Sequence, residues 1–155
     1  MAGTTNSRTT ATEPSSAAFS DQERAAMHEV VAEAKRARTR TTAAEKAAGD
    51  LADTIARIEG FEEPDRSIAG RIHELATAQG LDPRLWYGMP AWTRGGKLVL
   101  FFKDRAKFSS RYATLGFEES AALDDGAMWA TSFALAEPAE ADWDRIAELV
   151  ARAAG

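Results

Sequence analysis

Hydrophobic residues in the first half of the chain recur every three to four positions, which predicts helices. Ser20-Asp-Gln-Glu23 is a capping box, because the serine hydroxyl can accept from the third helical amide while the glutamate reaches back. A narrow apolar stripe follows it: Met27, Val30, Val31 and Ala34. Thr42-Ala-Ala-Glu45 repeats the capping box and predicts a second helix, which Gly60 ends. We expect a third helix from Pro64 to Gly80.

In the second half, apolar and polar residues alternate with a period of two, which predicts β-strands. Gly95-Gly96 has the backbone freedom of a tight hairpin turn. Pro90 cannot donate to a ladder, so its strand is expected at an edge or a bulge. The strands are expected at 86–92, 97–102, 107–115 and 128–135. Pro138 opens a closing helix with an inward apolar stripe: Trp143, Ile146, Ala147 and Val150.

Helices, then a run of strands, then a helix indicate an α+β domain. We predict a four- to five-stranded antiparallel sheet packed against N-terminal helices and a C-terminal helix. Residues 1–18 are rich in Thr, Ser and Ala and cannot bury enough apolar surface to offset the entropy of ordering. We therefore expect a disordered tail at 1–18, a helical arm at 19–41 and the α+β domain at 42–155.

Composition excludes several classes of function. The chain has 155 residues, a net charge of −5, no cysteine and two histidines, His28 and His73. Without cysteine there is no disulfide framework, thiolate nucleophile or thiolate metal site, and two histidines cannot form a three-histidine site. The acidic balance disfavours nonspecific binding to nucleic acid or to acidic membranes. The chain shows neither a signal sequence nor a membrane-spanning run, so we expect a cytoplasmic protein.

Three segments carry a resemblance to a known family. They are Trp86-Tyr-Gly-Met-Pro-Ala91, Lys107-Phe-x-x-Arg-Tyr-Ala-Thr-Leu-Gly-Phe117 and Leu123-Asp-Asp-Gly-Ala-Met-Trp129. Together they resemble the YdhG-like domain family, which is largely of unknown function, over roughly residues 42–154. The resemblance implies a frataxin-like outline. It also implies an iron chaperone that delivers iron to an acceptor protein, since some members are described so.

Iron in such a chain would need oxygen ligands, which can hold the ion weakly and exchangeably. We therefore expect no tightly bound cofactor, and iron only as an exchangeable ion. Three carboxylates recur at i, i+4 and i+8 on one face of the closing helix: Glu140, Asp144 and Glu148. An alternative acidic cluster lies between the second and third helices: Glu59, Glu62, Glu63 and Asp65. Acidic clusters of this kind are more often solvated faces, and Arg145 and Arg152 would compensate the charge of the first.

The competing interpretation is a small-molecule or protein-interaction module. Its pocket would lie along the aromatic strand and beside a basic–aromatic pair: Trp86, Tyr87, Met89, Trp92, Arg111 and Tyr112. Six basic residues between positions 94 and 111 also alternate with aromatics, a pattern found in single-strand nucleic-acid binding. Such residues more often guard a sheet against edge pairing. We therefore treat nucleic acid as a disfavoured ligand.

Enzyme activity has little support, because neither a G-x-S-x-G nor an S-x-x-K segment is present. The sequence therefore predicts a non-catalytic cytoplasmic binding protein. Iron handling through surface carboxylates is the first interpretation and a ligand pocket at the Trp86–Trp92 strand the second. The oligomeric state stays open.

Overall fold

The computed structural model describes residues 20–39 and 42–155, so the predicted tail at 1–18 lies outside the described residues. The chain forms an α+β fold with a five-stranded antiparallel sheet in the order β1-β2-β3-β4-β5. The elements are α1 (Asp21–Thr39), α2 (Ala43–Glu59), α3 (Asp65–Ala78), β1 (Asp82–Trp86), β2 (Met89–Arg94), β3 (Lys97–Lys103), β4 (Ala113–Phe117), β5 (Ser132–Leu135) and α4 (Glu140–Ala154). The predicted fold class is confirmed.

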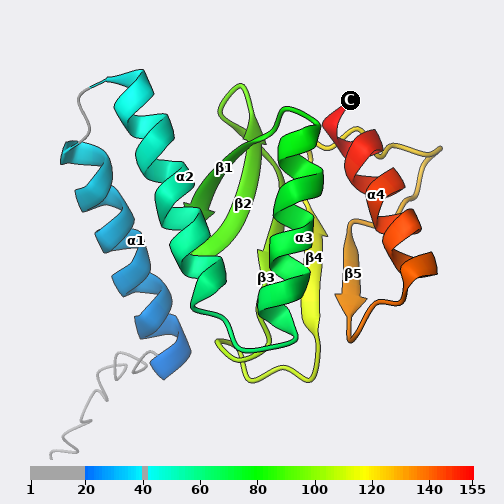
Figure 1. Ribbon diagram of the computed structural model, residues 1–155, viewed down its shortest axis with the longest axis horizontal. Coiled ribbons are helices and arrows are strands. Elements are labelled where there is room, and N and C mark those ends of the chain that lie inside the picture. Colours follow the sequence, from blue (N-terminus) through cyan, green and yellow to red (C-terminus); the bar gives the residue numbers. More distant parts are fainter. Residues whose placement is uncertain (1–19, 40–41) are drawn as a thin grey trace, which may run out of the picture.

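The domain has two layers, with α2, α3 and α4 on one face of the sheet (Figure 1). Helix α3 crosses the central strands, α2 lies over the β1 side and α4 over the β5 side, while α1 lies outside α2 (Figure 1). No helix in the described ranges is long and apolar enough to cross a membrane.

Both predicted helix starts are confirmed. The Ser20 hydroxyl accepts from the amide of Glu23 at 3.1 Å, and the Glu23 carboxylate accepts from the amide of Ser20 at 3.1 Å. The Thr42 hydroxyl accepts from the amide of Glu45 at 3.0 Å. These bonds satisfy amides that have no partner within their own helix. The capping side chains thereby fix where α1 and α2 begin.

The core lies between the sheet and the three covering helices. Trp92, Leu100 and Phe117 stand in register across β2, β3 and β4 and are almost wholly buried. They face the inward stripes of α3 and α4, which are confirmed: Ile68, Ile72, Trp143, Ile146 and Val150. Each fully buried large apolar side chain contributes about 1.5–3 kcal/mol.

The predicted strand at 86–92 is wrong, because it is a hairpin. Chain reversal occurs at Tyr87-Gly88, where both residues have positive φ, 51° and 75°. Trp86 ends β1 and pairs with Met89 at the start of β2. β2 is therefore an inner strand and not an edge, but it does carry the irregularity that was the other expectation, since its register with β3 shifts between Trp92 and Thr93. Pro90 itself pairs with β1 and lies beyond the residues paired with β3.

The predicted strand at 107–115 begins only at Ala113. Preceding residues form a loop because polar side chains take the backbone amides. Asp104, 5% exposed, accepts from the amide of Lys107 at 2.9 Å. Asp65 accepts from the amide of Arg105 at 2.7 Å. A chain whose amides are bound this way cannot pair as a strand.

The predicted strand at 128–135 is also shorter than expected, since β5 comprises only Ser132–Leu135. Its pairing partner β4 ends at Phe117, whose amide donates to the Thr131 carbonyl at 2.8 Å. Beyond that bond the chain has no strand to pair with, and Met128 is 88% exposed. Alternation in the sequence therefore continued past the length of the partner strand.

The arm helix α1 has no buried residue. The side chains of its predicted apolar stripe are largely exposed, with Met27 50% and Val31 67% accessible. Its half-buried face toward the domain includes charged residues, among them Glu29, Glu33 and Arg36. The arm is thus attached by polar groups rather than by its apolar stripe.

Candidate functional site

The predicted carboxylate ridge lies on α4, and its first member is already bound. Arg71 of α3 donates to both oxygens of Glu140, at 3.1 and 3.2 Å, and lowers the pKa of that carboxyl. The same guanidinium lies 4.5 Å from the ring centroid of Trp143. Asp144 and Glu148 remain exposed. The cation that offsets the ridge is therefore Arg71, which the sequence analysis did not identify.

The alternative acidic cluster is dispersed by the fold. Glu63 accepts from Arg66 at 3.0 Å and from the amide of Ser67 at 3.2 Å, and its pKa is lowered mainly by the side chain of Ser67. Asp65 is 3% exposed and accepts from Arg105 Nε at 2.8 Å. Glu59 and Glu62 face solvent.

Asp65 and Arg105 form a structural pair that joins three elements. Asp65 begins α3, Arg105 follows β3, and the guanidinium of Arg105 also donates to the carbonyls of Leu135 and Ala136 at 3.1 and 2.8 Å. Both oxygens of Asp65 therefore accept from Arg105, one from its side chain and one from its amide. Within residues 20–39 and 42–155, no group of three or more His, Asp or Glu is arranged to hold a metal ion.

The aromatic residues predicted to line one pocket are divided between the two faces of the sheet. Trp92 lies in the core, and its indole N–H donates to Nδ1 of His73 on α3 at 3.2 Å. Trp86 packs instead against Phe101, with ring centroids 5.2 Å apart. Phe101 covers Gly116 on the face opposite the helices, as their register shows.

The other predicted contact residues do not complete a pocket with Trp92. Tyr87 is 48% exposed at the hairpin turn, and Met89 is buried. Arg111 lies over the ring of its neighbour Tyr112 at 5.2 Å, in the loop before β4. Because Trp86 and Trp92 point to opposite faces, these residues cannot surround one ligand.

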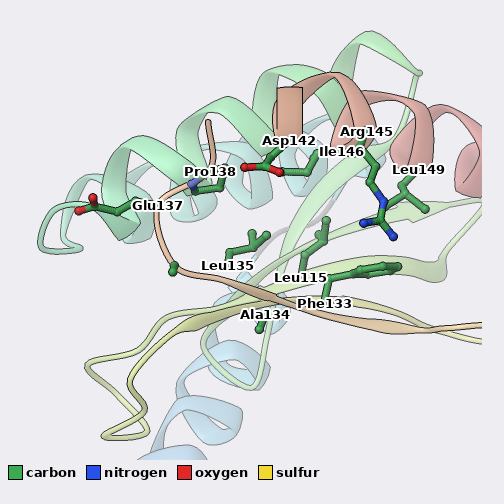
Figure 2. Close-up of a pocket in the computed structure, with 11 residues that line it drawn as sticks. Leu115, Phe133, Ala134, Leu135, Glu137, Pro138, Asp142, Arg145, Ile146 and Leu149 are labelled. Carbon is green, nitrogen blue, oxygen red and sulfur yellow. The ribbon is translucent and has the colours of Figure 1, made fainter. Parts of the chain in front are cut away.

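A cavity that the sequence did not predict lies between β5 and α4 (Figure 2). Its volume is about 220 Å³. Buried Leu115, Leu135 and Ile146 and half-buried Phe133 and Leu149 supply its apolar lining. The cavity forms because β5 is a short edge strand, so that α4 covers the end of the sheet incompletely.

Arg145 is the cation at this cavity. Its side chain reaches from α4 toward the ring of Phe133 (Figure 2), with the guanidinium 5.6 Å from the ring centroid. Among the described residues it forms no salt bridge. Asp142, one turn earlier, accepts from the amide of Ala139 at 2.9 Å and so caps α4. Glu137 also contributes to the lining, and its carboxylate extends away from the other labelled side chains (Figure 2).

The arrangement combines an apolar wall, the capping carboxylate of Asp142 and one cation, Arg145, which forms no salt bridge among the described residues. The cation can bind an anionic group of a ligand, and the apolar wall can bury the apolar part of the same ligand. Small-molecule sites are usually built in this way. The sequence pattern predicts Phe133 in a strand and Arg145 on the closing helix, but no local signal shows that the two residues meet.

Comparisons of the chain with protein-family models, with curated proteins and with solved structures found no match. The resemblance to the YdhG-like family therefore stays a prediction.

Proposed function

We propose that the protein binds a small molecule with a compact apolar body and one carboxylate, in the cavity between β5 and α4. The observation that carries the proposal is Arg145 over Phe133 at the edge of a cavity with a partly apolar lining, without a salt bridge in the part of the chain that the structure describes. The apolar body would cover Leu135, Ile146 and Leu149, and the carboxylate would meet the guanidinium.

The cavity volume restricts the ligand. At the packing density of protein interiors, about 0.75, a molecule of roughly 165 Å³ would fill a cavity of about 220 Å³. That size fits a single aromatic ring with a short carboxylate chain. For a ligand of this size, free energies of about −0.3 to −0.4 kcal/mol per non-hydrogen atom correspond to a Kd on the order of 1 mM.

The test is a titration with 3-phenylpropionate, followed by NMR of the full chain. We expect the signals of Phe133, Ile146 and Leu149 to shift together. The neutral analogue 3-phenylpropan-1-ol should bind at least several-fold more weakly, because it lacks the charge that Arg145 would meet. Acetate, which lacks the apolar body, should leave these signals unmoved.

The matched variants are Arg145→Gln and Arg152→Gln, both on α4. Arg145→Gln should weaken 3-phenylpropionate binding by about tenfold, since a charge-assisted hydrogen bond to an exposed group contributes about 1.5 kcal/mol. Arg152→Gln should leave binding unchanged. Equal affinity in wild type and Arg145→Gln would refute the proposal, as would shifts confined to other parts of the molecule.

An exchangeable iron carrier with an acceptor protein remains the proposal from the family resemblance. It would use Asp144 and Glu148 with Glu140, and Arg71 would have to release Glu140 first. Anaerobic titration with ferrous iron tests it directly. Selective paramagnetic loss at these three residues, abolished by replacing them with Asn, Gln and Gln respectively, would favour iron over the small molecule.

A further inference from the structure

The arm helix α1 is held against the domain at the β1–β2 turn, and the contact there is between carboxylates and donors. Glu33 accepts from the amide of Gly88 at 2.7 Å. Glu29 lies 3.5 Å from the guanidinium of Arg57 on α2. The two glutamates are one helical turn apart on α1 and point to the same side.

The domain groups converge on one point. A Cβ placed on Gly88 would lie 2.6 Å from Lys107 Nζ and 3.0 Å from Arg57 Nη2, and 2.9 Å from Cγ of Glu29. Lys107 also donates to the carbonyl of Tyr87 at 2.7 Å, so it is fixed beside the turn. Glycine is required at position 88 for two reasons: its φ is 75°, and no side chain would fit.

Helix α1 only partly satisfies the two cations at this point, Arg57 and Lys107. Arg57 Nε is buried and has no hydrogen-bond partner among the described residues. Burial lowers the pKa of Lys107 and the neighbouring charge of Arg57 lowers it further, and together they outweigh the carboxylates of Glu29, Asp104 and Glu33, which raise it. A second anionic oxygen at this point would stabilise both cations.

Helix α1 leaves hollow space around the contact. A cavity of about 710 Å³ lies between Glu29 and Arg36 of α1 and the domain residues Arg57, Leu85 and Lys107. Another, of about 520 Å³, extends along α1 toward β1. Because no residue of α1 is buried, its attachment depends on polar contacts that another carboxylate could replace.

We propose that Gly88, Arg57 and Lys107 form a binding site for an acidic helical peptide with two glutamates at i and i+4, and that α1 occupies this site as an internal competitor. The helical class follows from α1 itself, which presents Glu29 and Glu33 with that spacing. A third contact, Arg36 to Asp53 at 3.1 Å, lies one turn further and sets the direction of the bound helix. The site is independent of the cavity between β5 and α4.

The experiment uses the full chain with the double substitution Glu29→Gln and Glu33→Gln. We expect the Gly88 amide signal to shift and the amides of α1 to gain the exchange rates of a free helix. The signals of Trp92 should stay in place and show that the domain is folded. Asp21→Asn, which removes an exposed carboxylate from the same helix, should change neither.

A peptide of residues 20–39 is then added to the double variant. The wild-type peptide should restore the Gly88 signal, with at least tenfold higher affinity than a peptide carrying both glutamines. It should bind wild-type protein at least tenfold more weakly, because the internal α1 competes. Adding Lys107→Gln to the double variant should abolish the binding of the wild-type peptide.

Three results would overturn the proposal. One is an unmoved Gly88 signal in the double variant, since the carboxylates would then not hold the arm. Another is equal binding of the two peptides. The third is glutarate matching the wild-type peptide in affinity, which would make the site one for free dicarboxylates.

Discussion

Gly116 and Phe101 make a quantitative test of packing on the sheet face opposite the helices. The two residues pair across β3 and β4, and the phenyl ring covers the glycine. A Cβ at position 116 would lie 2.1, 2.4 and 2.7 Å from three atoms of that ring. Gly116 is not among the residues with positive φ, so its backbone would accept alanine. Only the ring forbids the methyl group.

The expected cost of Gly116→Ala follows from two opposing effects. The ring must move by more than 1 Å to reach ordinary contact distance, and Trp86 limits its movement because the ring centroids are 5.2 Å apart. Overpacking of this kind costs about 1–3 kcal/mol. Replacing glycine by alanine in a strand returns about 0.5–1 kcal/mol of conformational entropy. We expect a net loss of about 1–2 kcal/mol in the free energy of unfolding.

A double-mutant cycle separates the two effects. Urea unfolding of wild type, Gly116→Ala, Phe101→Ala and the double variant gives four free energies. Without the phenyl ring, the methyl group should be neutral or stabilise by about 0.5 kcal/mol. The coupling energy between the two sites should therefore be about 1–2.5 kcal/mol.

Gly70 supplies the control. It lies within α3, and a Cβ there would meet no atom within 4 Å. Gly70→Ala should stabilise the protein by about 1 kcal/mol. The reasoning fails if Gly116→Ala is as stable as wild type, or if its effect is the same with and without the ring of Phe101.

Two further predictions concern His73 and Asp65. Burial lowers the pKa of His73, so the folded state favours the neutral ring that accepts from Trp92. Stability should be full above the unfolded pKa of about 6.5, should fall as the pH drops from there through the lower folded pKa, and then level off. Urea midpoints between pH 5 and 8 should show this slope, and His73→Gln should remove it; a slope that persists in the variant would contradict the assignment. Asp65→Asn should cost about 3 kcal/mol, because it leaves the partly buried Arg105 without its carboxylate, whereas Glu62→Gln should change stability by less than about 0.5 kcal/mol. Equal urea midpoints for the two variants would show that the pair contributes no more than an exposed charge.

The helices of this protein could be predicted because their signals are local. Capping at Ser20 and Thr42 and the inward stripes of α3 and α4 depend on residues within a few positions of one another. The hairpin at Gly95-Gly96 could be predicted for the same reason, because a glycine pair is itself a local turn signal. Both glycines have positive φ in the structure. Local rules fail at Tyr87-Gly88, because a tyrosine at positive φ is not a usual turn residue. There the turn is held by Lys107 and Glu33 from distant segments.

The candidate sites depend on which segments meet, and that is decided by tertiary structure. The sequence by itself determined the α+β class, the helix starts, the central apolar strand and the absence of cysteine chemistry. It could not show that Arg71 would reach Glu140, that Arg145 would lie over Phe133, or that α1 would turn its charged face toward Gly88. Short-range sequence patterns predict only that carboxylates and cations face solvent. Their pairing depends on the packing of elements far apart in sequence, because charges interact through distances that only the folded chain sets.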